Sequence, residues 1–507
     1  MTALIWNILK NSADKYKDHI AIEYGDQKIS YDELYQRAIQ LSEELKQLGM
    51  KKGDNVLLAM DNCIEFAQAF FAINLAGGTI IPVYMNIGEN KLINIINFYE
   101  IKFILTIKKY QKILGKVVQN EINSLSHILY ITNLKESLDK EIQLTSEKLL
   151  TTSSPYENSE VPAIILFSSG TTSMPKGIML SDNNIQTNVE AISDYLHLKD
   201  EDKILLIKNI NHASSITGEL LVSINNGSTL FMVTGILTAS HIMETIEKNK
   251  ITVLFGVPTI LSAMMTHSDF DQYDLTSLKI INFYGASMAS SKIKELATKF
   301  PKANIIYSYG LTEAAPRVTY IMRDALLKKE GSSGIPIKDV EVRIVLEDKE
   351  VTPYTVGEIC VKGPNVMVGY YKNSQMTKDK LRDNWLHTGD LGYKDEDGYL
   401  YVTGRKDNLI IKTGKNIYPE EIEAVIMGVK GVKEVLVRGE EDDLLGEDIV
   451  AYIVMANDTT VKLLDILKHC QNELEDYKIP GKVYKVDSLE KTISGKIIRK
   501  QVINNKS

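Results

Sequence analysis

Short apolar runs alternate with longer segments of helical periodicity through most of the chain. The strand-like run at 51–60 precedes a helix-like segment at 63–78, which ends on two glycines before the next strand at 79–84. Similar apolar runs recur at 101–107, 161–167, 203–207, 228–233, 251–257 and 278–285. This alternation predicts mainly parallel sheets covered by helices on both faces. Ligands of such sheets bind at the carboxyl ends of the strands, so the loops there are the first candidates for a site.

The pattern changes beyond Gly331. Residues 331–364 show short alternating strands with turn residues between them, which predicts an antiparallel β subdomain. The last hundred residues change again and predict a small α+β unit. The chain is therefore expected to fold as several units.

Composition excludes several classes of protein. With 507 residues, 44% of them hydrophobic and 24% charged, the chain is too long for one domain and too apolar to be disordered. A net charge of −8 disfavours nucleic-acid binding. Three distant cysteines (Cys63, Cys360 and Cys470) form no CxxC pair, which argues against a disulfide framework or a zinc site and favours a reducing cytosol. We expect a cytoplasmic enzyme with no membrane span and no secretory signal.

Charge is unevenly distributed over the C-terminal unit. Residues 440–448 are rich in carboxylates, which we interpret as a solvated surface. Residues 478–507 are strongly basic and could instead face a polyphosphate ligand.

The most informative loop directly follows the strand at 161–167. It runs from Phe167 to Gly177 with the sequence FSSGTTSMPKG, and most of its residues are Ser, Thr, Gly or Lys. Hydroxyls, free backbone amides and one ammonium group suit a polyphosphate, and glycines let the backbone approach it closely. Neither GxxxxGK[ST] nor GxGxxG occurs in the chain, so the P-loop NTPase and Rossmann dinucleotide-binding classes are excluded.

This loop resembles the phosphate-binding signature of the adenylate-forming superfamily, which includes acyl- and aryl-CoA ligases and stand-alone adenylation enzymes. Further family motifs follow in the same order: YGLTE at 309–313, GSSGIP at 331–336, GE at 357–358, GPNVMVGYY at 363–371, WLHTGD at 385–390, GRKD at 404–407, NIYPEEIE at 416–423 and SGK at 494–496. The resemblance implies an N-terminal domain (1–406) of two βα-layered subdomains plus a β-barrel-like subdomain. It also implies a small, mobile α+β C-terminal domain (407–507).

The family's chemistry assigns roles to these motifs. A carboxylate attacks the α-phosphate of ATP to give an acyl-adenylate and pyrophosphate, and the acyl group then passes to a thiol. The resemblance implies that Thr312 donates to phosphate, that Glu313 holds Mg²⁺, and that Lys496 stabilises the developing charge. The implied phosphate-binding residues are Ser168, Ser169, Gly170, Thr171, Thr172 and Lys176. His212 completes the implied catalytic set.

The same resemblance implies the adenosine site and the domain movement. Gly285, Ala286 and Ser287 match the segment along the adenine edge, and Tyr309 matches the aromatic residue that stacks on the base. Asp390 and Arg405 match the ribose contacts. Asp407 matches the hinge, about which the C-terminal domain turns to bring first Lys496, and then the loop around Gly414, to the substrate.

The acid substrate is specified less clearly. His212, Tyr284 and Arg317 are the expected acid-pocket residues, and the absence of an acidic residue from Asn209 to Gly218 disfavours α-amino acids. Arg317 could point into the pocket and favour a second acidic group, or keep its head in solvent. The chain departs from the family pattern at Ser173, Thr413 and Glu490, without losing a group the mechanism needs.

Three functions remain open at this point. The first is an ATP-dependent ligase that joins a small carboxylic acid to CoA, acting as a monomer or homodimer. The second is a stand-alone ligase that loads the phosphopantetheine thiol of a separate carrier protein. The third is a catalytically inactive nucleotide-binding paralogue, which would be expected to lack Glu313, Asp390 or Lys496, all of which are present.

Overall fold

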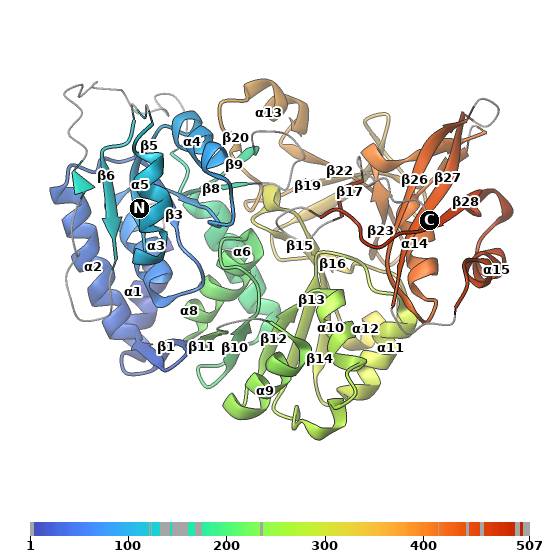
Figure 1. Ribbon diagram of the computed structural model, residues 1–507, viewed down its shortest axis with the longest axis horizontal. Helices are drawn as coiled ribbons and strands as arrows, with labels where there is room; N and C mark the ends of the chain where they lie inside the picture. The colour runs from blue at the N-terminus through green and yellow to red at the C-terminus, as the bar shows by residue number, and fades with distance from the viewer. Residues whose placement is uncertain are drawn as a thin grey trace.

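The strands that the structure describes form four sheets in a mixed α/β architecture. The computed structural model describes residues 5–120, 122, 124–131, 142–143, 161–167, 175–233, 237–413, 415–442, 446–456, 461–491 and 497–499. Within these residues the sheets contain nine, eight, six and five strands. Figure 1 shows the N-terminal helices and the eight-stranded sheet at one end and the sheet of the C-terminal residues at the other.

The eight-stranded sheet contains the first predicted βα segments. Its strand order is β20 (Gly369–Tyr370), β9 (Gly177–Leu180), β8 (Ile164–Phe167), β4 (Thr79–Pro82), β3 (Asn55–Ala59), β5 (Ile101–Thr106), β6 (His127–Tyr130) and β7 (Ile142–Gln143). The strands from β8 to β6 are parallel, as predicted, and antiparallel strands flank them on both sides. The helices of this part are α2 (Tyr31–Gln47), α3 (Ile64–Ala76), α4 (Glu89–Phe98) and α5 (Gln111–Val117).

The nine-stranded sheet repeats this construction. Its order is β16 (Ile335–Pro336), β15 (Arg317–Met322), β14 (Asn304–Gly310), β13 (Ile280–Tyr284), β12 (Val253–Gly256), β10 (Lys203–Leu206), β11 (Thr229–Met232), β1 (Ile20–Tyr24) and β2 (Gln27–Ser30). The strands from β14 to β1 are parallel. Its helices include α9 (Ala239–Asn249), α10 (Pro258–Met265), α11 (Ser290–Lys299) and α12 (Arg323–Lys328).

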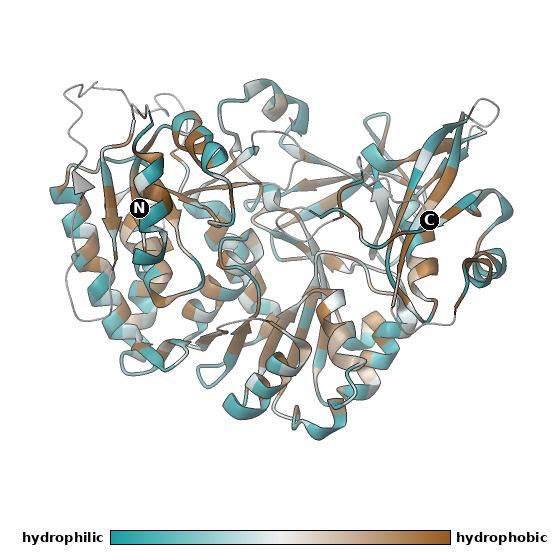
Figure 2. Cartoon of the chain, viewed as in Figure 1, coloured by the Kyte–Doolittle hydropathy of each residue, from teal (hydrophilic) through white to brown (hydrophobic). Residues whose placement is uncertain are grey.

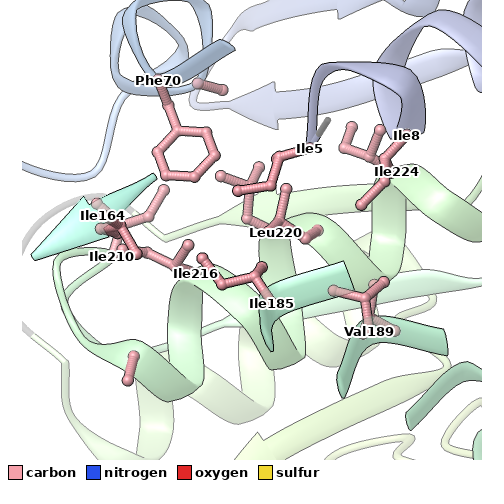
Figure 3. Close-up of a cluster of buried hydrophobic side chains, with 14 of the residues drawn as sticks. Ile5, Ile8, Phe70, Ile164, Ile185, Val189, Ile210, Ile216, Leu220 and Ile224 are labelled. Atoms are coloured by element: carbon pink, nitrogen blue, oxygen red, sulfur yellow. The ribbon is translucent and has the colours of Figure 1, made fainter. Parts of the chain in front are cut away.

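One hydrophobic core joins these two sheets. Helices α1 (Ile5–Tyr16) and α3 meet α6 (Asp182–Leu196), the π-helix η2 (Ile216–Leu221) and α8 (Val222–Asn226) between them. Figure 3 shows Phe70, Ile5 and Leu220 among the buried side chains of this core. Burying each such side chain stabilises the fold by about 1.5–3 kcal/mol. Figure 2 shows the complementary pattern, with hydrophobic residues along the strands and hydrophilic residues on the outer helices.

The predicted antiparallel β subdomain follows the nine-stranded sheet. It contains β17 (Glu341–Leu346), β18 (Lys349–Glu350), β19 (Gly357–Lys362), β21 (Leu381–Arg382), β22 (Trp385–Lys394) and β23 (Leu400–Arg405), with α13 (Ser374–Lys380) beside it. All pairings in it are antiparallel, as predicted. Among the described residues its strand order does not close into a complete ring.

The C-terminal residues form a separate α+β unit with its own core. It contains β24 (Ile410–Lys412), β25 (Lys415–Ile417), β26 (Val432–Asp442), β27 (Gly446–Met455) and β28 (Lys482–Lys485), covered by α14 (Pro419–Met427) and α15 (Leu463–Glu473). A 3-10 turn, η5 (Lys406–Asn408), joins it to the antiparallel subdomain. The position of the domain boundary at Asp407 stays a prediction. No described helix is long and apolar enough to cross a membrane.

Candidate active site

The YGLTE motif continues directly from the end of β14. Tyr309 and Gly310 close the strand, and Thr312 and Glu313 form the short 3-10 helix η4 (Thr312–Ala314). The side-chain amide of Asn188 donates to the Ala314 and Arg317 carbonyls at 3.3 and 2.9 Å. Asn365 donates to the same two carbonyls at 2.9 and 3.0 Å, so the turn is fixed from two sides.

Gly310 is required where this turn folds back on β15. A Cβ atom at position 310 would overlap the Pro316 carbonyl oxygen, which is a backbone atom that cannot turn away. Gly310→Ala is therefore expected to lower the free energy of unfolding by about 1–3 kcal/mol and to displace the motif. Chemical denaturation checks this, with Gly331→Ala as control; Gly331 has a positive φ but meets no atom within 4 Å. Equal losses in both variants would contradict the expected clash.

Tyr309, Asp390 and Arg405 form one connected group. The Tyr309 hydroxyl donates to Asp390 Oδ2 at 2.5 Å, and Arg405 Nη1 pairs with Asp390 Oδ1 at 2.8 Å. Burial, together with the Asp390 carboxylate, raises the pKa of Tyr309 well above its usual value, so its hydroxyl remains a donor. The aromatic residue and the two polar residues expected around adenosine thus lie together, although β14 and β22 belong to different sheets.

The loop expected along the adenine edge follows β13. Gly285, Ala286 and Ser287 are exposed, and Gly285 has a φ of +87°, a conformation that favours glycine. Because β13 and β14 are parallel neighbours, this loop and Tyr309 emerge at the same edge of the sheet.

Glu313 is linked through Tyr370 to β9, which directly follows the loop expected to bind phosphate. The Tyr370 hydroxyl donates to Glu313 Oε1 at 3.0 Å, and Tyr370 pairs with Ile178 in the β20–β9 ladder. Burial and the Glu313 carboxylate raise the pKa of Tyr370, which keeps it protonated as a donor. The exposed Lys176 lies just before β9, the strand that pairs with β20. Lys176 and Glu313 are therefore connected through this strand pair and the Tyr370 hydroxyl.

The donor set at Glu313 fits Mg²⁺. Magnesium is usually held by one or two carboxylates together with substrate phosphates and water. Glu313 would be the carboxylate that holds the ion here, together with phosphate oxygens of the substrate. When bound, the ion would neutralise charge between the β- and γ-phosphates.

A buried charged cluster lies at the expected acid pocket. Tyr284, at the end of β13, donates to Glu219 Oε1 at 2.6 Å, and Lys208 Nζ pairs with the same oxygen at 2.9 Å. Arg317 places its guanidinium carbon 4.0 Å from the centre of the Tyr284 ring. Only 2% of Arg317 is exposed, so its guanidinium does not extend into solvent; a position in the acid pocket stays a prediction. His212 is exposed at the start of the short helix α7 (Ala213–Ser215).

Several expected site residues lie outside the described residues: Ser168, Ser169, Gly170, Thr171, Thr172, Ser173, Gly414 and Lys496. Asp407 is exposed in η5, between the antiparallel subdomain and the C-terminal unit. Sequence reasoning missed Lys208, Glu219 and the supports Asn188, Asn365 and Tyr370. Tyr370 could have been identified from the motif GPNVMVGYY, which contains it. No local sequence pattern indicates that Lys208 and Glu219 belong to one cluster.

Comparison with known proteins supports the same assignment over the whole chain. The model of the "AMP-binding enzyme" family matches residues 9–371, and that of the "AMP-binding enzyme C-terminal domain" matches residues 421–496. The long-chain-fatty-acid–CoA ligase of Bacillus subtilis (strain 168) is 29% identical, and the match covers 99% of this chain and 94% of that protein. The 2-succinylbenzoate–CoA ligase of Bacillus cereus (strain AH820) is also 29% identical, with 98% and 97% covered.

The solved structures agree with these matches. The o-succinylbenzoate CoA synthetase of Bacillus subtilis, in complex with its acyl-adenylate intermediate, superposes with a TM-score of 0.82 at 25% identity, covering 99% of both chains. The same enzyme with ATP and a magnesium ion gives a TM-score of 0.81 at 26% identity, covering 98% of both chains. The expected fold is therefore confirmed. The chain belongs to the AMP-binding enzyme family, and it is an AMP-forming acid–thiol ligase.

Proposed function

We propose that this protein activates a small carboxylic acid with ATP and Mg²⁺ through an acyl-adenylate, releases pyrophosphate, and transfers the acyl group to the thiol of CoA. The observation that carries the proposal is the connected group of Tyr309, Asp390 and Arg405 beside Glu313. An aromatic ring at the end of β14, a buried carboxylate on β22 and a carboxylate that could bind a metal ion suit a nucleoside triphosphate.

Each of these side chains has a defined task. Two acceptor oxygens on Asp390 can take both ribose hydroxyls, because each carboxylate oxygen accepts more than one hydrogen bond. Arg405 and the Tyr309 hydroxyl hold that carboxylate in place. Glu313 and Lys176 gather the phosphates, which brings the α-phosphate and the acid carboxylate together despite their mutual repulsion. His212 and Thr312 complete the reacting site in this proposal.

The two half-reactions are assigned to two positions of the C-terminal unit. Asp407 in the short turn η5 is the proposed pivot, since one exposed turn connects the two cores. Lys496 serves adenylation, and the loop around Gly414 serves thiol transfer. We place the reaction in the cytoplasm, where the three buried, unpaired cysteines would remain reduced. A separate carrier protein is the alternative acceptor.

An ATP–pyrophosphate exchange screen tests the proposal. The full chain is supplied with Mg²⁺ and a panel of fatty, aromatic and dicarboxylic acids that includes 2-succinylbenzoate, and the best acid is then offered CoA or a holo-carrier protein. We expect exchange with at least one acid, followed by an acyl-CoA detected by mass spectrometry. Glu313→Gln is the matched control and should lose Mg²⁺-dependent exchange. Exchange followed by acylation of the carrier alone would contradict the choice of CoA.

A further inference from the structure

A buried cluster at the acid pocket contains one more cation than its internal contacts neutralise. Lys208, Glu219 and Tyr284 form one group, in which Glu219 Oε1 accepts from both partners and Lys208 Nζ also donates to Ser214 Oγ at 2.9 Å, while Glu219 Oε2 has no hydrogen-bond partner. Lys208 and Glu219 cancel each other in charge. The guanidinium of Arg317 is therefore left as the unbalanced charge of the cluster.

One edge of the Arg317 guanidinium makes no hydrogen bond. Its Nε and Nη2 atoms are buried and have no hydrogen-bond partner, although its backbone is fixed by Asn188 and Asn365. These two nitrogens form the side-on fork of a guanidinium, whose parallel N–H groups match the two oxygens of a carboxylate. An unpaired buried charge costs several kcal/mol, so its retention points to a ligand that pairs with it.

The backbone at Gly218 packs closely against the Nη2 side of the fork. Position 218, which faces Arg317, is a glycine, and a Cβ atom there would come within 3.1 Å of Arg317 Nη2. Gly218 and Glu219 belong to the π-helix η2, and π-helical turns occur frequently at functional sites. The fork also lies close to the chemistry, since Arg317 follows Glu313 by four residues and Tyr284 precedes the adenine-edge loop.

We propose that the acid activated by this protein carries a second carboxylate, distal to the reacting one, which accepts hydrogen bonds from Nε and Nη2 of Arg317. This inference rests on the proposed adenylation of a carboxylic acid. Glu219, held by Lys208 and Tyr284, keeps that second carboxylate from pairing with Lys208 and so directs it to Arg317. The Tyr284 ring lies against the guanidinium and holds its plane.

The charge of the cluster also makes the preference depend on pH. Burial lowers the pKa of Lys208 to about 8. The Glu219 carboxylate on η2 acts against this lowering, and the Arg317 guanidinium on β15 adds to it. The Tyr284 hydroxyl on β13 accepts a hydrogen bond from Lys208. Below pH 8 Lys208 is charged and the cluster carries one net positive charge. Above pH 8 Lys208 loses its proton, and the net charge falls to zero. The preference for an acid with two carboxylates should therefore decline as the pH rises through about 8.

Matched pairs of acids test the proposal. ATP–pyrophosphate exchange is measured for the straight-chain diacids from malonate to suberate, each beside its monomethyl ester, which removes only the distal charge. The wild type should favour its best diacid over the ester by about 10–100-fold in kcat/KM, the size expected for hydrogen bonds to a charged group. In Arg317→Met the ratio should fall to about one, and in Arg317→Lys it should be intermediate because the fork is lost but the charge remains.

Thermal unfolding separates ligand binding from a structural role of Arg317. Arg317→Met should have an equal or higher Tm without ligand, because an unpaired buried cation is removed, and the best diacid should raise the Tm of the wild type but not of the variant. A large loss of Tm in the variant, or equal exchange of diacids and esters by the wild type, would overturn the inference while leaving adenylation in place. Absence of exchange with every acid would overturn the proposed function itself.

Discussion

Replacing Lys496 with alanine is expected to remove nearly all acyl-adenylate formation and to leave the transfer of a supplied acyl-adenylate to CoA intact. During adenylation, negative charge develops on the pentacoordinate α-phosphate, and a lysine ammonium stabilises it as a point charge. Loss of one such preorganised group lowers kcat by about 10²–10³-fold. Thiol transfer breaks the acyl–phosphate bond in the other proposed position of the C-terminal unit, where Lys496 is not needed. Pyrophosphate exchange measures the first half-reaction, and acyl-CoA release from synthetic acyl-adenylate measures the second.

Lys491→Ala is the matched control for this variant. Lys491 belongs to the same basic segment, but its ammonium pairs with Glu434 at 2.7 Å and is 41% exposed. Such a surface pair is worth about 0–1 kcal/mol, so both half-reactions should keep their rates. Equal losses of adenylation and transfer in Lys496→Ala would show that one position of the C-terminal unit serves both reactions.

The alternation of strands and helices could be predicted because it is local. The runs at 79–84 and 101–107 became β4 and β5, and the change of pattern beyond Gly331 became the antiparallel subdomain. Each of these segments carries its own hydrophobic periodicity, which sequence alone reveals. The nucleotide-binding roles stay a prediction; they could be assigned because the phosphate-loop and YGLTE motifs are continuous stretches that resemble the family's motifs.

The charged cluster at the acid pocket could not be predicted in the same way. Lys208, Glu219 and Tyr284 come from three separate segments, and only the parallel order β10–β12–β13 and the π-helix bring them together. The sequence around Arg317 does not indicate that it is buried either, because an arginine beside a strand usually extends its guanidinium into solvent. Its burial depends on the antiparallel pairing of β15 with β14, which places Arg317 opposite Gly310. Long-range pairing of this kind leaves no local pattern.

Asp390→Ala is expected to raise the KM for ATP and to lower kcat/KM by about 10²–10⁴-fold, with little dependence on the acid. Asp390 is 7% exposed and accepts from Tyr309 and Arg405, so its oxygens are fixed before the ribose arrives. Hydrogen bonds to a charged acceptor contribute about 1.5–3 kcal/mol each, and two ribose hydroxyls would lose theirs. Alanine also leaves Arg405 without the carboxylate that holds it.

Asp202→Ala distinguishes loss of ATP binding from loss of stability. Asp202 is 4% exposed at the start of β10 and accepts from Lys279 and Thr252, so it too is a buried carboxylate paired with a cation. Both variants should lose comparable stability in denaturant titrations, because each removes a buried charged acceptor and leaves its partners unpaired. Only Asp390→Ala should change the KM for ATP. If the two variants shifted that KM equally, the effect would come from the fold, and the ribose would have to be held by other residues of the site.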